Sequence, residues 1–178
     1  MNKIILIICL LPILSATSCN NDDDNNAQNP IDQLPPETQT GENTFGFIVN
    51  GEPINVTNTS HQTAIYQGGG LLIGAQKEIN SSFTQINMFI SETIIGEPIQ
   101  ADTSYILNTS SVPKGEYYNE AQNCFYYTSS NHNGLLKITH LDTENFVVSG
   151  TFEFQAKSDS CEEVINITNG RFDLQYIP

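Results

Sequence analysis

Two cysteines in the body of the chain are the residues whose chemistry the sequence constrains most. The chain has four cysteines, of which Cys124 and Cys161 lie far from the N-terminal segment. Both are expected at the ends of strands, where two loops can meet on one rim of a domain. In an exported chain such a pair favours a disulfide, with two separate buried thiols as the alternative. Metal binding is disfavoured, because neither cysteine belongs to a Cys-x-x-Cys pair.

The other chemically informative cysteine is Cys19. A positive start at Lys3 is followed by an apolar run and then by the small residues Ala16-Thr17-Ser18. This pattern is typical of a secretory signal peptide, and its end resembles a bacterial lipobox. We therefore predict a lipoprotein signal peptide over 1–18, with diacylglycerol on the Cys19 thiol as the membrane anchor. The alternatives are an ordinary signal peptide that happens to end near this cysteine and an apolar first strand of the domain.

Residues 19–43 are predicted to be the lipidated cysteine followed by a flexible tether. The segment is polar and contains Pro30, Pro35 and Pro36, which disfavour a regular ladder. Its acidic run Asp22-Asp23-Asp24 resembles a tag that exports lipoproteins to the cell surface, and a solvated spacer is the equal alternative. The predicted location is the bacterial cell envelope, at the outer membrane and on its surface.

The remainder, residues 44–178, is predicted to be a single all-β domain. Asn50-Gly51 and Gly68-Gly69-Gly70 supply the backbone freedom of hairpin turns. Apolar and polar residues alternate over 146–156, with Phe146, Val148, Phe152 and Phe154 on the inward face. The apolar phase changes near Asn169-Gly170, which favours a bulge. We expect an antiparallel β-sandwich or flattened barrel of about 8–11 short strands.

Neither acid–base nor metal chemistry has a clear set of residues. The histidines His61, His132 and His140 are far apart in sequence, and no Gly-x-Ser-x-Gly motif or carboxylate pair stands out. No catalytic residue, metal site or cofactor is predicted, and an enzyme is the least favoured class. The formal charge of −14 argues against nucleic acid and anionic lipid headgroups as partners.

Aromatic residues offer one candidate binding surface. Tyr117, Tyr118, Tyr126 and Tyr127 could stack on a sugar or a peptide. The alternative is that these rings pack on a face of the sheet, and the chain has no Trp, the residue best suited to stacking.

Several short motifs resemble an uncharacterised family of small bacterial envelope lipoproteins. They are the segment 34–41, Thr44-Phe45-Gly46, Val49-Asn50-Gly51, the segment 150–154 and the segment 169–173. The resemblance implies a lipid-anchored all-β domain and carries over no catalytic residue. Two functions are therefore considered: a surface-displayed module that binds a glycan, a small molecule or a protein, and a structural or accessory subunit of an envelope assembly.

Overall fold

The computed structural model describes residues 29–161 and 163–178, so the predicted signal peptide and Cys19 lie outside the described residues. The described chain is built from strands joined mostly by short turns. Its elements are β1 (Thr44–Val49), β2 (Glu52–Val56), β3 (Gln62–Gln67), β4 (Gly70–Ile79), β5 (Ser82–Ser91), α1 (Glu92–Ile95), β6 (Thr103–Leu107), β7 (Lys114–Asn119), β8 (Cys124–Tyr127), β9 (Gly134–Asp142), β10 (Val147–Lys157) and β11 (Val164–Gln175). None of the helical segments in this part of the chain is long and apolar enough to cross a bilayer.

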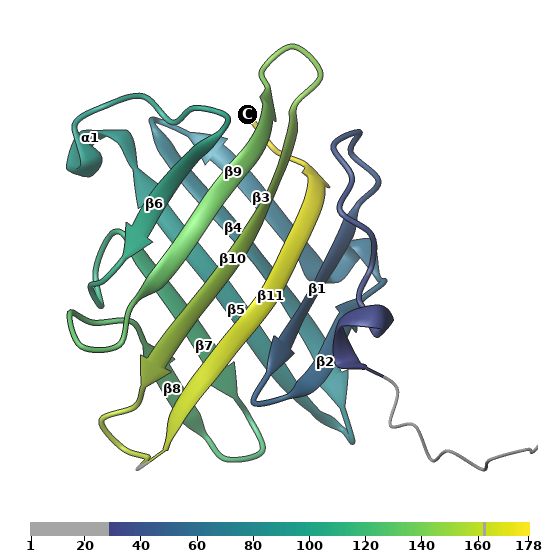
Figure 1. The fold of residues 1–178 in the computed structure, drawn as a ribbon, viewed down its shortest axis with the longest axis vertical. Helices are drawn as coiled ribbons and strands as arrows, with labels where there is room; N and C mark the ends of the chain where they lie inside the picture. The colour runs from purple at the N-terminus through teal and green to yellow at the C-terminus, as the bar shows by residue number, and fades with distance from the viewer. Residues whose placement is uncertain (1–28, 162) are drawn as a thin grey trace, which may run out of the picture.

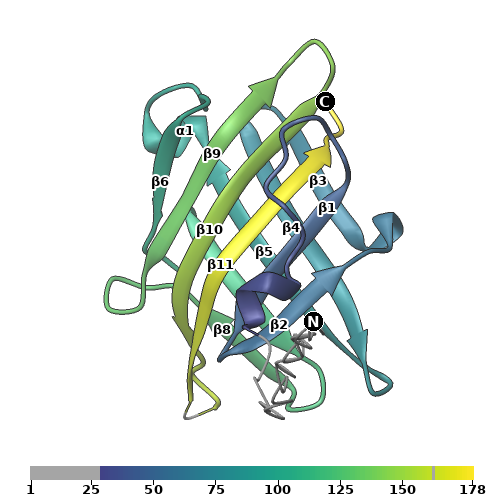
Figure 2. The ribbon, with the colours of Figure 1, turned by 45° about the vertical axis from the view of Figure 1, so that its right-hand side comes forward.

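The strands form one antiparallel sheet that curls into a nearly closed barrel (Figure 1). The strand order is β2-β1-β11-β10-β8-β7-β5-β4-β3, while β9 pairs with β10 and with β6. The layer of β6, β9, β10, β11 and β1 crosses the layer of β3, β4, β5, β7 and β8 (Figure 2). Beyond β11, Ile177 bridges to β3, through one 2.9 Å hydrogen bond from Tyr66 N–H to its carbonyl and one from its own N–H to Ala64. The predicted fold class is confirmed, in its barrel form and with eleven strands.

Turn residues position the first two hairpins as predicted. Asn50 and Gly51 have φ angles of 49° and 93°, and Gly68 and Gly69 have 57° and 73°. Positive φ at both central residues gives the turn a twist that matches the strands it joins. Pro53 lies on β2, which pairs only with β1 and ends the sheet, where a missing N–H costs no ladder bond.

The bulge expected near Asn169-Gly170 lies in the middle of β11. Phe152 and Phe154 of β10 are two residues apart, but their partners Gly170 and Ile167 are three apart. The extra residue, with Asn169 at a φ of 52°, lets the odd-numbered Ile167 and the even-numbered Phe172 both face the core. Gly170 is required here, because a Cβ would overlap the ring of Phe152.

The alternation predicted for β10 is confirmed, apart from its first residue. Val148, Phe152 and Phe154 are at most 3% exposed. Phe146 is 42% exposed, so its predicted inward position is wrong. It precedes the strand with a φ of 57°, and its ring packs on Tyr176 at a centroid distance of 5.7 Å.

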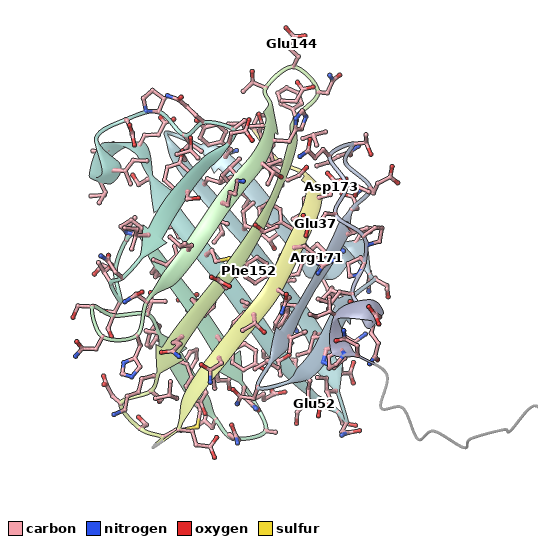
Figure 3. All side chains as sticks on the ribbon, in the orientation of Figure 1. Glu37, Glu52, Glu144, Phe152, Arg171 and Asp173 are labelled. Atoms are coloured by element: carbon pink, nitrogen blue, oxygen red, sulfur yellow. A yellow bond between two sulfur atoms is a disulfide. The ribbon has the colours of Figure 1, made fainter. Side chains whose placement is uncertain are left out.

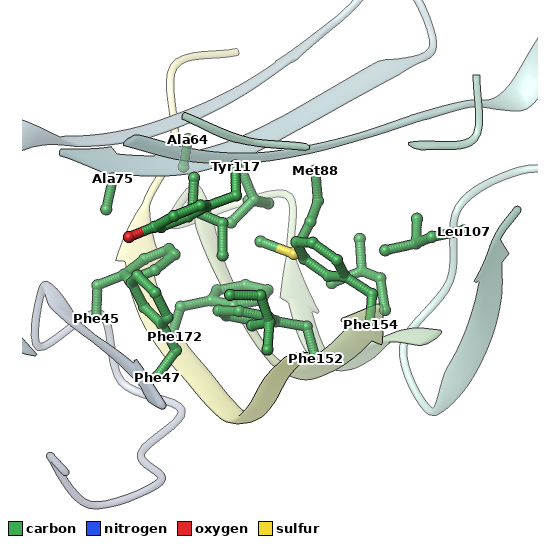
Figure 4. Close-up of a cluster of buried hydrophobic side chains, with 14 of the residues drawn as sticks. Phe45, Phe47, Ala64, Ala75, Met88, Leu107, Tyr117, Phe152, Phe154 and Phe172 are labelled. Carbon is green, nitrogen blue, oxygen red and sulfur yellow. The ribbon is translucent and has the colours of Figure 1, made fainter. Parts of the chain in front are cut away.

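Aromatic side chains fill the middle of the barrel (Figure 4). The rings of Phe45, Phe47, Phe152 and Phe172 pack with centroids 5.5 to 6.3 Å apart, in edge and offset arrangements. Tyr117 and other side chains of the opposite layer close over them. Because these side chains occupy the centre, room for a ligand exists only toward the ends of the barrel or outside it.

Residues 29–43 differ from the flexible tether predicted across 19–43. Pro30–Gln33 form a turn of 3₁₀ helix, Leu34 is only 8% exposed, and the Arg171 guanidinium donates to the Pro35 carbonyl at 3.3 Å. This segment therefore lies against the barrel, although the sequence gives it no strand or helix pattern.

A buried carboxylate anchors that segment. Asp173 is 1% exposed and accepts hydrogen bonds from the N–H groups of Thr40, Gly41 and Glu42 at 2.9–3.0 Å and from the Ser149 hydroxyl at 2.7 Å. Burial by itself would raise the pKa of Asp173, but these hydrogen bonds outweigh it and hold the pKa below its ordinary value. Figure 3 shows Asp173 on β11, the strand that also carries Arg171.

Candidate ligand site at one end of the barrel

The four tyrosines considered for stacking fall on two faces of the sheet. Tyr117 and Tyr126 point into the core and are 3% and 1% exposed. Tyr118 and Tyr127 lie on the outer face, because successive residues of a strand point to opposite sides. A single platform made of all four is therefore not formed.

The outer face instead carries a row of rings that pack on one another. Centroid distances are 5.6 Å from Phe83 to Tyr118, 4.1 Å from Tyr118 to Phe125 and 6.4 Å from Phe125 to Tyr127. The last two pairs are stacked, with interplanar angles of 24° and 7°. Sugar stacking uses ring faces, and most faces in this row are turned toward a neighbouring ring, so the row offers a glycan mainly edges.

The predicted disulfide is confirmed. Cys124 and Cys161 are bonded, with their Cα atoms 6.2 Å apart. Cys124 begins β8 and Cys161 lies in the loop from β10 to β11, so the bond ties two connections at one end of the barrel. In Figure 1 this is the lower end.

A pocket of about 460 Å³ opens at that same end, where β1 meets β2, β4 meets β5 and β7 meets β8. Figure 3 shows Glu52, a residue of its rim, at this end. The volume lies within the range of small-molecule sites in proteins. Most of the wall is apolar, and its apolar side chains are those of Val49, Pro53, Ile54, Ile79, Phe83 and Ala121.

Two buried hydroxyls face this apolar space. Thr84 and Tyr117 line the pocket and are 8% and 3% exposed. Burial raises the pKa of Tyr117, and the neighbouring Thr84 hydroxyl partly offsets that rise. Even so, Thr84 Oγ1 makes no contact with hydrogen-bond geometry to any described residue. The pocket can therefore hold an apolar body and offer hydroxyls to one polar group.

The widest hollow on the side of the barrel is a less suitable site. It measures about 420 Å³, crosses the outer face of β9, β10 and β11, and is lined by Glu37, Lys137, Glu153 and Arg171 among others. It is shallower than the end pocket, and its charges are of both signs. No single ligand charge is favoured there.

The histidines are not brought together into a site. His61 is in the turn before β3, His132 is in the turn before β9, and His140 is in β9. Among the described residues, no group of three or more His, Cys, Asp or Glu side chains could hold a metal ion.

The fold and the site together define an antiparallel barrel with a pocket of ligand size at one end. The chain belongs to the family described as Domain of unknown function (DUF6252), which matches residues 48–174 and so spans the barrel from β1 to β11. No curated protein and no solved structure is significantly similar to the chain. Membership in a family without assigned activity is thus established, while the lipid anchor and envelope location stay predictions.

Proposed function

We propose that this chain is a lipid-anchored binding protein of the bacterial cell envelope that takes a small molecule into the barrel-end pocket. The observation that carries the proposal is the pocket itself, of about 460 Å³ with mostly apolar walls. Its residues come from five strands, so a folded barrel presents them without rearrangement. A glycan on the outer aromatic row is less well supported, because those rings cover one another.

The anchor and location rest on the sequence. Lys3, the apolar run and Ala16-Thr17-Ser18 before Cys19 support export, cleavage and lipidation. Asp22-Asp23-Asp24 supports transfer to the outer face of the outer membrane.

Binding is tested with N-phenyl-1-naphthylamine, a neutral dye that fluoresces in apolar surroundings. The protein is residues 19–178 with Cys19→Ala, which retains the whole core cluster of residues 45–176 without the apolar leader. We expect saturable 1:1 binding. Ala121→Trp fills the rim of the pocket and should weaken binding at least tenfold, whereas Ala101→Trp, in an exposed turn before β6, should leave it unchanged. Absent binding, or equal weakening by both variants, would overturn the proposal.

Anchoring is tested separately with Cys19→Ala in the complete chain. This variant should take up no fatty-acid analogue and should leave the membrane fraction. Unchanged labelling would exclude Cys19 as the lipid site.

A second candidate is an accessory subunit of an envelope assembly. It is supported by Ile106 of β6 and Leu135 of β9, cross-strand neighbours that are 57% and 41% exposed beside the outer edge of β6. Crosslinking in native membranes tests it: a crosslinked partner that is lost in Ile106→Lys and kept in Ile94→Lys, a change at another exposed isoleucine, would favour this role.

A further inference from the structure

We infer that the end pocket selects an uncharged amphipathic molecule whose hydrogen-bonding group is held by the hydroxyls of Thr84 and Tyr117. This inference rests on the proposed function and adds the chemical class of the ligand. Two features of the pocket carry it: a buried hydroxyl without a partner, and walls without a matching charge.

The Thr84 hydroxyl is fixed in place by its strand. On β5, Thr84 shares the inward phase of Ile86, Met88 and Ile90, which are 0% exposed, and it is the inward residue closest to the open end of the barrel. A buried hydroxyl left without a partner costs about 1–3 kcal/mol. A ligand that exchanges a hydrogen bond with Thr84 removes this cost, so binding gains more from that bond than from one that merely replaces water.

Tyr117 lies next to it and supplies a second hydroxyl on the adjoining strand β7. The pair can both donate to and accept from one ligand group, such as an amine, an amide or an alcohol. The apolar wall then contacts the rest of the molecule.

Charge argues against an anionic ligand. Among the described residues that line the pocket, Glu52 alone carries a formal charge, and it is exposed at the rim. Lys77, the cross-strand neighbour of Thr84, lines a different hollow together with His61 and Glu78. Burying an ion in apolar surroundings without a partner is strongly unfavourable, and the chain as a whole has 20 acidic against 6 basic residues.

The test compares two dyes with the same anilinonaphthalene body. N-phenyl-1-naphthylamine is neutral and has one N–H, and 8-anilino-1-naphthalenesulfonate adds a sulfonate. We expect the sulfonate to bind at least tenfold more weakly. Thr84→Val, which keeps the shape and removes the hydroxyl, should weaken binding of the neutral dye about fivefold, the value of one hydrogen bond. Its melting temperature should not fall, because an unpaired buried hydroxyl is lost.

The outcomes separate the inference from the function beneath it. If the neutral dye binds and Ala121→Trp weakens it, but the sulfonate binds equally or Thr84→Val has no effect, the ligand class is wrong and the pocket stands. If the neutral dye does not bind, both fail. Thr84→Ser is the matched control, since it keeps a hydroxyl, and it should bind within twofold of the unaltered protein.

Discussion

Replacing Asp173 with asparagine tests how the N-terminal segment is held on the barrel. The carboxylate accepts four hydrogen bonds, with Oδ2 receiving the Thr40 and Glu42 N–H groups and Oδ1 receiving Gly41 N–H and the Ser149 hydroxyl. In the variant, the amide oxygen can keep one pair, while the NH₂ group must face two N–H donors. Loss of two charge-assisted hydrogen bonds at about 1.5–3 kcal/mol each gives a cost of about 3–6 kcal/mol. Because the segment can detach and relieve the conflict, we expect the lower end, about 3 kcal/mol.

The sign of the pH dependence follows from the lowered pKa of Asp173. A carboxylate with a depressed pKa in the folded state stabilises the fold above its unfolded pKa of about 3.9. That stability is lost as the pH falls through the folded pKa. Asp173→Asn should therefore be less stable at pH 7 and should lose less stability than the unaltered protein between pH 5 and pH 2.

Urea unfolding followed by tyrosine fluorescence at several pH values measures both effects. Limited proteolysis should also cut the variant first within residues 35–43. Asp159→Asn, at an exposed aspartate of the loop from β10 to β11, is the control and should change neither property. A variant within 0.5 kcal/mol of the unaltered protein at pH 7, or with the same acid dependence, would refute the role given to Asp173; this threshold is about the scatter of surface substitutions.

Three further changes have defined expectations. Replacing Cys124 and Cys161 together with serine should lower the free energy of unfolding by about 4 kcal/mol, since the bond joins positions 37 apart; an unchanged urea midpoint would contradict this. Gly170→Ala should cost about 2 kcal/mol, because the new methyl group overlaps the Phe152 ring, and a melting temperature equal to that of the unaltered protein would show that the bulge adapts. Replacing Asp22-Asp23-Asp24 with alanine should protect the protein from protease added to intact cells, and equal digestion would remove the export-tag interpretation.

Local patterns were sufficient for most of the strands. Hairpins follow from Asn50-Gly51 and from the glycine triplet, and the bulge in β11 follows from a change of apolar phase. In each case the cause is a backbone preference or a side-chain period within a few residues. The division of Tyr117 from Tyr118 also follows from that period, although composition alone had grouped them.

Long-range contacts were beyond the reach of such patterns. Asp173 and its partners at Thr40 to Glu42 are more than 130 positions apart, and neither side carries an apolar period. A buried carboxylate among backbone N–H groups resembles any other strand aspartate in the sequence. The same holds for Phe83, which joins the row of Tyr118 and Phe125 only because β5 pairs with β7.

The two ends of the barrel differ in a way that accounts for a single end pocket. At the end opposite the disulfide, the segment after β5 folds over the opening. Glu92 accepts hydrogen bonds from the Tyr66 hydroxyl and from Ile99 N–H, which lowers the pKa of Glu92 and holds this segment in place. Ile99 is then only 4% exposed and fills that end. The end near Cys124 has tight turns and no such covering segment among the described residues, so its inward strand ends, including Thr84, stay accessible to a ligand.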